Sequence, residues 1–280
     1  EQIDPGRCDV VLSAQAPGEC ARQAGDWLER RAVVIDLSAD FRLRSADAYR
    51  TWYGAEHPSA ALLAQAVLAL PELDPAGIAE AALLALPGCF TTAVLLACGP
   101  AVAANLVHPD VVVDGKTGVS GAGRNASAEY LFSEVAESVL PYQVSGHRHR
   151  PEMEQALGEL GGQPCSVTFV PHLVPMVRGL VATCYLRLQP QVSLSEVREA
   201  YAARYQGQPF VRLSVGPVAS KAVSQTNLCY VHLEEQGSHL VATAVLDNLG
   251  RGASGQAVQV LNLRFGMSPQ SGLPQSSWWP

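Results

Sequence analysis

Lysine is nearly missing from this sequence, and no run of basic residues is present. Lys116 and Lys221 are the two lysines among 280 residues, and the net charge is −7. Proteins that bind nucleic acid or anionic membranes through their charge need a basic patch. The longest apolar stretch, residues 93–107, is broken by Gly99 and Pro100 and is too short to cross a bilayer. We therefore expect neither a nucleic acid nor a membrane as partner.

Cysteine pairs at the spacing of a metal site or a disulfide framework are also missing. The seven cysteines are scattered along the chain and odd in number. A zinc site needs cysteine or histidine ligands at short recurring spacings, and none is found. We expect no bound metal, and a reducing, cytoplasmic location suits this pattern best.

Short apolar runs alternate with helical patterns over the first 90 residues. Strands are expected within 8–18, 32–43, 66–73 and 81–88, and helices near 19–30, 59–65 and 75–81. This alternation predicts a parallel sheet with helices on its faces.

The later part of the chain has longer strand patterns joined by short turns. Strands are expected within 110–124, 165–189 and 227–252, the last pair turning at Gln236-Gly237, and helices at 196–207 and 252–266. Long strands with short connections favour a mostly antiparallel sheet, and hence a second domain of the α+β type.

Cys89 stands between a Pro87-Gly88 turn and an apolar segment with helical spacing. At the start of a helix, backbone N–H groups point at the sulfur, which lowers the pKa of the thiol and makes it a nucleophile. The alternative is a buried structural cysteine. The tripeptide alone does not decide between the two.

Two polar loops could serve such a nucleophile. Residues 118–124 ("GVSGAGR") form either a nest of backbone N–H groups for an anion, with Arg124 as a bidentate partner, or a flexible turn. His147 and His149 precede a helix that we expect to begin at Pro151. The helix dipole disfavours a cation at that end, so we favour an acid/base or substrate role for the imidazoles over a surface role.

Two further segments have plain structural alternatives. His172 lies among apolar residues and two prolines, where a hydrogen-bonded core histidine is the better interpretation. Residues 246–257 enter a helix through small residues, which either let a ligand approach the backbone or accompany N-capping by Asn248 or Ser254. Together the segments supply a thiol, an imidazole, an anion-binding loop and an open helix entry, which acyl transfer through a thioester requires.

Five motifs resemble, in this order, those of the N-acetyl-gamma-glutamyl-phosphate reductase family. They are "LPGCFTTA", "KTGVSGAGR", "GHRHRPEMEQ", "VTFVPHLVPMVRG" and "DNLGRGASGQAVQ". Earlier segments such as "VVIDLSADFRL" extend the resemblance over nearly the whole chain. It implies an NADPH-dependent oxidoreductase of arginine biosynthesis, which reduces N-acetyl-glutamyl 5-phosphate to the 5-semialdehyde through a cysteine thioester.

The resemblance also implies roles for single residues. Cys89 is the nucleophile, and a histidine of the GHRH motif transfers protons, with His147 favoured and His149 as second choice. The implied substrate-binding residues are Ser120, Arg124, Arg148 and Glu152. The implied cofactor-binding residues are Gly18, Asn248, Gly252, Gly255 and Gln256. A homo-oligomer, dimer or tetramer, is expected.

The resemblance assigns residues 1–88 and 252–280 to a Rossmann-type NADP-binding domain, and residues 89–251 to an α+β catalytic and dimerisation domain. The family begins with a strand and a GxxGxxG turn that cradles the cofactor pyrophosphate. That turn is missing here, so we expect the first βαβ unit to be absent, as in a fragment or a misplaced start. Weak or absent NADPH binding by the 280-residue chain follows.

Two alternatives stay open on the sequence. A lysine-pathway homologue would reduce an aminoadipyl phosphate carried on a small acidic protein, and would need a basic docking face that this composition does not favour. A catalytically inert, truncated dimerisation module would leave Cys89 no more reactive than Cys98. Aspartate-semialdehyde dehydrogenase shares the chemistry but not these histidine and arginine motifs.

Overall fold

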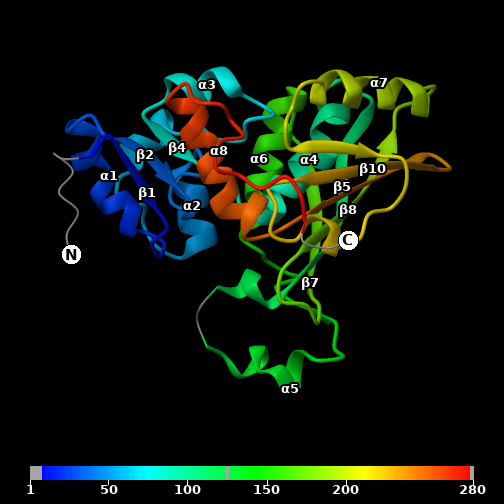
Figure 1. Ribbon diagram of the computed structural model, residues 1–280, viewed down its shortest axis with the longest axis horizontal. Helices are drawn as coiled ribbons and strands as arrows, with labels where there is room; N and C mark the ends of the chain where they lie inside the picture. Colours follow the sequence, from blue (N-terminus) through cyan, green and yellow to red (C-terminus); the bar gives the residue numbers. More distant parts are fainter. Residues whose placement is uncertain (1–7, 124–125, 278–280) are drawn as a thin grey trace. The chain divides into compact units, whose positions relative to one another are not determined.

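A computed structural model describes residues 8–123 and 126–277, which form two units (Figure 1). The chain divides between Gly88 and Cys89, and the segment Gln256–Leu273 returns to the first unit. Each unit has a sheet of its own.

The first unit is built on a four-stranded parallel sheet with the strand order β1-β2-β4-β3. The strands are β1 (Val10–Ser13), β2 (Val33–Asp36), β3 (Val67–Leu68) and β4 (Leu83–Ala85). The helices are α1 (Glu19–Glu29), α2 (Ala46–Tyr53), the 3-10 helix η2 (Ala60–Gln65), α3 (Pro75–Glu80) and α8 (Gly255–Arg264). The expected parallel sheet is confirmed, although β3 is much shorter than predicted because Pro71 cannot continue a strand ladder.

Both faces of this sheet are covered by helices. Val34 and Leu83 belong to a core that includes the buried face of α1, while their neighbours Ile35 and Leu84 belong to a second core with Val260 of α8. A strand buried on both faces has no polar side to alternate with, so its sequence is continuously apolar. This is why "AVVID" and "AALLAL" were recognisable as strands.

Helix α2 has no counterpart among the predicted helices. Its start is fixed by Ser45, whose hydroxyl oxygen accepts a hydrogen bond from the N–H of Ala48 at 3.3 Å. An N-cap serine followed by Asp47 in the first turn is a recognisable start signal. The buried ring of Tyr49 holds the helix on the unit through a 3.2 Å hydrogen bond from its hydroxyl to Asp40.

The second unit contains a seven-stranded mixed sheet with the order β6-β7-β5-β8-β11-β10-β9. Its strands are β5 (Val107–Thr117), β6 (Leu140–Pro141), β7 (Ser166–Leu173), β8 (Leu180–Leu188), β9 (Val211–Ser214), β10 (Cys229–Gln236) and β11 (His239–Leu246). The pairs β5–β7 and β9–β10 are parallel and the other pairs are antiparallel, which confirms the mostly antiparallel sheet. The hairpin turns at Gly237-Ser238, one residue later than predicted, with Gly237 at a φ of 60°.

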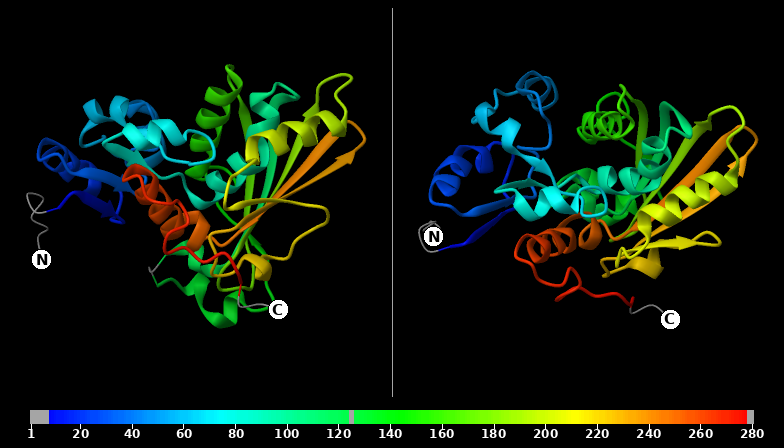
Figure 2. Two further views of the ribbon diagram at one scale, coloured as in Figure 1. Left: turned by 45° about the horizontal axis from the view of Figure 1, so that its top comes forward. Right: turned by 90° about the horizontal axis from the view of Figure 1, so that it is seen from above.

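Helices cover one face of this sheet (Figure 2). They are α4 (Cys89–Ala103), α6 (His149–Gly161) and α7 (Leu194–Tyr205), with the short helix α5 (Phe132–Val135) and the 3-10 helices η3 (Val119–Ala122), η4 (Ala128–Tyr130) and η5 (Ser220–Val223) in the loops. Residues of the opposite face are more open: Val112 and Tyr185 are 43% and 39% exposed. Among the described residues, no helix has the length and apolar character to cross a membrane.

Helix α4 continues through Pro100, although Gly99 and Pro100 interrupt the apolar stretch in the sequence. A proline in a helix leaves the carbonyl four residues earlier without its N–H partner. Here that carbonyl belongs to Leu96, and the Tyr205 hydroxyl of α7 donates to it at 2.5 Å, while the Tyr201 hydroxyl donates to the carbonyl of Ala97. The buried Tyr205 therefore supplies the hydrogen bond that the proline removes.

Candidate active site

The nucleophile candidate stands at the first position of a long helix. Helix α4 begins at Cys89, as the turn before it predicts, so the positive end of the helix dipole lies at this thiol. Cys89 is partly exposed, whereas Cys98 in the same helix is fully buried. Exposure and dipole together are the environment of a reactive thiol rather than of a structural one.

Cys89 opens into a cavity of about 820 Å³ within the second unit. Three other predicted site residues line this cavity with it, namely His147, Arg148 and His149. The loop that follows β5 adds Thr117, Gly121 and Ala122, and the segment around η4 and β6 adds a wall of Glu129, Tyr130 and residues 140–143. The thiol and both imidazoles are thus brought to one cavity by segments some 60 residues apart in the chain.

The orientation of His147 is set by the start of α6. Nδ1 of its ring accepts a hydrogen bond from the backbone N–H of His149 at 3.1 Å. A ring nitrogen that accepts carries no proton in the neutral imidazole, so the proton of His147 is on Nε2. The rings of His147 and His149 lie with their centroids 4.7 Å apart, and Phe90 and Phe169 pack edge-on against His147 at 6.0 and 5.1 Å.

Surroundings of this kind favour a neutral imidazole. Burial lowers the pKa of His147 to about 3, and the neighbouring His149 and Arg148 also lower it. The carboxylate of Glu152 acts in the opposite direction and raises this pKa. At neutral pH the ring is therefore an uncharged hydrogen-bond donor through Nε2. It can donate to a developing negative charge in the cavity.

Helix α6 begins two residues earlier than predicted. It starts at His149 with Arg148 as N-cap, so Pro151 occupies the third helical position and not the first. The first N–H groups of a helix have no carbonyl partner within the helix, so a proline costs no hydrogen bond at that position either. The shift matters because it places the N–H of His149 where it can bond to His147.

Tyr142 is a cavity residue that the sequence analysis missed. Its ring centroid lies 5.7 Å from that of His147. Burial raises the pKa of the Tyr142 phenol, and a negative charge on Cys89 raises it further, so the phenol stays protonated beside the thiol. Its short distance in sequence from His147 was the one available signal.

A backbone turn packs directly behind Cys89. Residues Gly250–Ser254 form a π-helical turn, η6, that leads into α8. A Cβ added at Gly252 would stand 2.7 Å from the Cβ of Cys89, and one at Gly255 would stand 2.4 Å from the amide oxygen of Asn227. The glycines are therefore required by close packing within the second unit, and Gly252 sets how near the turn comes to the thiol.

We expect Gly252→Ala to slow alkylation of Cys89 by iodoacetamide by roughly tenfold, because the new methyl group must displace the cysteine from its place at the helix start. The cost in stability should stay at about 1–3 kcal/mol. Gly216→Ala is the matched control, since a Cβ there meets no atom within 4 Å. Equal alkylation rates in the two variants, measured by mass spectrometry, would contradict this account of Gly252.

Two of the other predicted substrate-binding residues, Glu152 and Ser120, lie near the cavity. Glu152 is 1% exposed and accepts a 2.8 Å hydrogen bond from the hydroxyl of Thr91, so it joins α6 to α4 behind the cavity. Ser120 precedes the cavity residues Gly121 and Ala122, and its hydroxyl oxygen accepts from Asn248 at 3.0 Å. Arg124 lies outside the described residues.

The predicted nest of N–H groups is not formed by residues 118–121 and 123. The N–H groups of Gly118, Val119 and Ser120 donate to carbonyls of residues 176–179, and those of Gly121 and Gly123 donate within the loop. Of the two alternatives that the sequence left open, the nest is not formed by these residues, because the loop docks along a neighbouring segment, which the local sequence does not reveal. An anion in the cavity would have to be held by other groups.

The start of α1 does not fit the diphosphate of a dinucleotide. Gly18 caps α1 with a φ of 87°, yet its N–H donates to the carboxylate of Asp40 at 2.6 Å, and the N–H of Ala21 donates to the same group at 3.0 Å. The helix start that would hold a phosphate already holds a carboxylate. Gln256 is also occupied, since its amide donates to the carbonyl of Ala69 at 3.0 Å.

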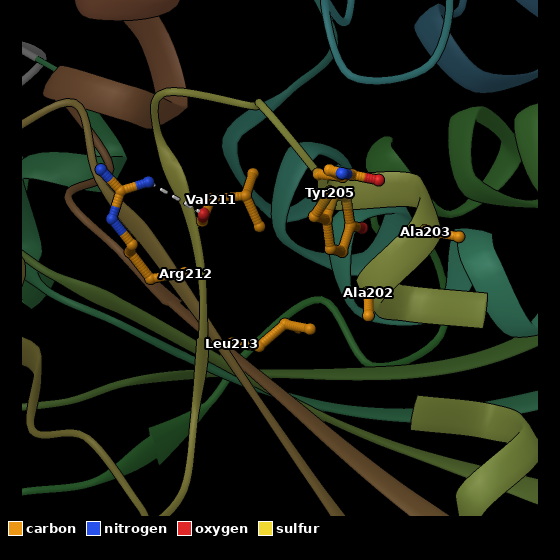
Figure 3. A pocket seen from close by; sticks show the side chains of 7 residues that line it. Ala202, Ala203, Tyr205, Val211, Arg212 and Leu213 are labelled. Carbon is orange, nitrogen blue, oxygen red and sulfur yellow. Dashed lines mark hydrogen bonds between the residues drawn. The ribbon is translucent and has the colours of Figure 1, made fainter. Parts of the chain in front are cut away.

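A second hollow, of about 410 Å³, lies between α7 and β9 (Figure 3). Val211 and Leu213 point toward Tyr205, while Arg212 points to the other side of the strand and donates to the carbonyl of Val211 at 3.2 Å. The Tyr205 hydroxyl donates its hydrogen bond to a backbone carbonyl of α4. This hollow therefore presents an apolar floor without an acid, base or nucleophile. In the part of the chain described, no three metal-ligand side chains come together either.

Known proteins resemble this chain over nearly its whole length. A family model described as the semialdehyde dehydrogenase NAD binding domain matches residues 1–81, and one described as the semialdehyde dehydrogenase dimerisation domain matches residues 89–248. The N-acetyl-gamma-glutamyl-phosphate reductase of Dehalococcoides mccartyi strain 195 is 41% identical over 271 residues, which cover 96% of this chain and 80% of the relative. That of Laribacter hongkongensis is 43% identical over 273 residues, covering 95% and 78%.

Among solved structures, aspartate semialdehyde dehydrogenase II of Vibrio cholerae, complexed with ASA, superposes with a TM-score of 0.73 at 19% identity. The match covers 95% of this chain and 82% of that one. At this identity the likeness supports the fold alone.

Proposed function

This chain belongs to the N-acetyl-gamma-glutamyl-phosphate reductases of the semialdehyde dehydrogenase family, and on that premise we propose how its residues act. The reaction is the reduction of N-acetyl-glutamyl 5-phosphate to N-acetyl-glutamate 5-semialdehyde with release of phosphate, in arginine biosynthesis. The observation that carries the assignment of roles is the position of Cys89, which starts α4 and opens into a cavity shared with two histidines.

In the first step the Cys89 thiolate attacks the acyl carbon. A sulfur–carbon bond forms, the bond from that carbon to the phosphate oxygen breaks, and inorganic phosphate leaves with the bonding electron pair. The enzyme then carries a thioester. Its reduction needs a hydride, which a nicotinamide cofactor supplies when it is bound.

His147 is the proton-transferring residue that we favour, with His149 second. Its Nε2–H can stabilise the negative charge that develops on the acyl oxygen or on the leaving phosphate. His149 instead uses its backbone N–H to fix the ring of His147. Arg148 lines the same cavity, and we propose that its guanidinium group contacts the phosphate. Ser120, Arg124 and Glu152 remain our further candidates for orienting the substrate.

The relatives described above are reductases of N-acetyl-gamma-glutamyl phosphate, which favours the free substrate over one carried by a protein. To test this, the chain is mixed with N-acetyl-glutamyl 5-phosphate without any cofactor, and phosphate is measured with time. We expect a burst of one phosphate per Cys89, and a much smaller burst from a carrier-linked aminoadipyl phosphate. A chain that alkylates normally at Cys89 but releases no phosphate from the free substrate would contradict the proposed function.

The match to the NAD binding domain model indicates a nicotinamide cofactor, and we propose that it is NADP(H). Of the residues predicted to bind it, Asn248, Gly252 and Gly255 remain our candidates, because the N–H of Gly18 and the amide of Gln256 already have partners within the first unit. We expect NADPH to bind the 280-residue chain with a dissociation constant weaker than about 1 μM, because the N–H groups at the start of α1 are held by Asp40. Calorimetric titration checks this, with the phosphate burst as proof of folded protein, and micromolar or tighter binding would refute it.

We further propose a cytoplasmic homo-oligomer, a dimer or a tetramer. The match of residues 89–248 to a dimerisation domain model supports it, as do the exposed side chains of Val112 and Tyr185 on the uncovered face of the second sheet. Light scattering on the purified chain measures the mass directly, and a monomer at micromolar concentration would exclude the oligomer.

A further inference from the structure

An ion pair with a buried carboxylate and a partly exposed arginine lies next to the active-site cavity without lining it. Nε and Nη2 of Arg178 donate to the two carboxylate oxygens of Asp247, both at 3.0 Å. The carboxylate is fully buried, while the Arg178 side chain is 32% exposed. Burial alone would raise the pKa of Asp247, but Arg178 and three backbone N–H groups lower it overall, so the group is a carboxylate at neutral pH.

The carboxylate holds the turn behind the nucleophile. It accepts hydrogen bonds from the N–H groups of Leu249 and Gly250, both at 2.9 Å, at the start of η6. The N–H of Gly252 donates to the backbone carbonyl of Asp247, also at 2.9 Å. Gly252 in turn packs so close to the Cβ of Cys89 that a side chain at position 252 would not fit. The position of the thiol therefore depends on a turn that Asp247 caps.

The residue that follows Arg178 holds the loop that contributes Gly121 and Ala122 to the cavity lining. The N–H of Gly179 donates to the amide oxygen of Asn248 at 2.8 Å, and the carbonyl of Gly179 accepts the N–H of Gly118 at 3.1 Å. The amide nitrogen of Asn248 donates to Ser120 at 3.0 Å. The loop that begins at Gly118 is thus held in place by two pairs of sequence neighbours, Arg178-Gly179 and Asp247-Asn248. The same two pairs hold the turn behind the thiol.

We propose that the Arg178–Asp247 pair is a positioning clamp, which fixes the distance between the Cys89 sulfur and the cavity loop that begins at Gly118, so that a bound acyl phosphate presents its carbonyl carbon to the sulfur. This inference rests on the proposed function. Both residues act through others, since neither lines the cavity. One carboxylate with five donors from three parts of the chain fixes geometry more tightly than an apolar contact, which has no preferred direction.

The test compares Arg178→Lys and Asp247→Asn with the unmodified chain. Lysine keeps the charge but cannot make the bidentate contact, and asparagine keeps the shape but not the charge. Asp114→Asn is the control, because it removes a carboxylate that pairs with Lys116 and His172 in the same unit and does not line the cavity. For each protein we measure the phosphate burst over a range of N-acetyl-glutamyl 5-phosphate, the alkylation rate of Cys89 against pH, and thermal unfolding.

We expect the burst rate constant to fall by about 10- to 100-fold in both clamp variants, with the half-saturating substrate concentration changed by less than about threefold. Alkylation of Cys89 should slow as well, and Asp114→Asn should behave like the unmodified chain. If the pair had only a structural role, the variants would unfold at a lower temperature. The burst rate constant would then not fall separately from the half-saturating substrate concentration.

Chemical rescue covers the case in which Asp247→Asn does not fold. Arg178→Ala opens a partly exposed space beside Asp247, and millimolar guanidinium should restore its burst rate by about tenfold, whereas Asp114→Asn should not respond. Folded clamp variants with unchanged burst and alkylation rates would overturn the clamp, as would the absence of rescue. If the unmodified chain gives no burst, the proposed function fails, and the alkylation rates of Cys89 still decide for or against the clamp.

Discussion

Cys89→Ser is expected to abolish the phosphate burst, with a loss of roughly 10⁴-fold or more. The loss is this large because no second thiol lines the cavity among the described residues, and a serine at the helix start keeps its proton at neutral pH where a thiol can lose it. The fold should be preserved, since serine has nearly the same shape and Cys89 is only partly buried. Rapid-quench measurement of phosphate and a thermal melt check the two statements.

Cys98→Ala is the matched control for the nucleophile. It lies in the same helix and is fully buried, and burial together with Cys184 raises the pKa of its thiol well above the usual value. We expect this variant to keep the burst, with some loss of stability from the cavity it creates. In the unmodified chain, alkylation of Cys89 should show an apparent pKa below the 8.5 or so of an ordinary thiol. A reactive Cys98, or an ordinary pKa at Cys89, would favour the inert dimerisation module instead.

Replacing His147 by asparagine should slow the phosphate burst by roughly 10²- to 10⁴-fold, the usual range for loss of a proton-transferring group. His149→Asn keeps the backbone N–H that fixes the ring of His147, so we expect a loss of no more than about tenfold. The reverse order of the two losses would show that His149 carries the proton. Burst measurements on the two variants at pH 7.5 give the comparison directly.

His147→Asn should also change how stability depends on pH. The folded state holds this imidazole at a pKa of about 3, against 6.5 for an ordinary histidine. Between these values the unfolded chain binds a proton that the folded chain does not, so the contribution of His147 to stability is present above pH 6.5 and declines as the pH falls toward 3. Urea unfolding at pH 7.5, 5.5 and 4.5 should show a smaller decline for the variant than for the unmodified chain. Identical declines would contradict a buried neutral imidazole.

Much of the fold could be predicted because local patterns report burial. The strands of the first unit are apolar without alternation, and this marks a parallel sheet covered on both faces. The long strands of the second unit alternate along β5, β7 and β8, and this marks a sheet with one covered face. The continuation of α4 through Pro100 could not be predicted, because its compensation comes from Tyr205, more than 100 residues away.

The sequence alone determined which groups are available: a thiol after a Pro-Gly turn, two histidines before a helix, and glycines where the chain enters α8. These follow from local chemistry, namely turn residues, helix starts and side-chain types. Tertiary structure decided what each group touches. In the folded chain, N–H groups of the 118–123 loop donate to carbonyls, and Tyr142 lies beside the Cys89 thiol. The proton of His147 is on Nε2, and Asp247 forms an ion pair with Arg178. Hydrogen bonds and burial of this kind join residues distant in the chain, and their partners cannot be known until the chain is folded.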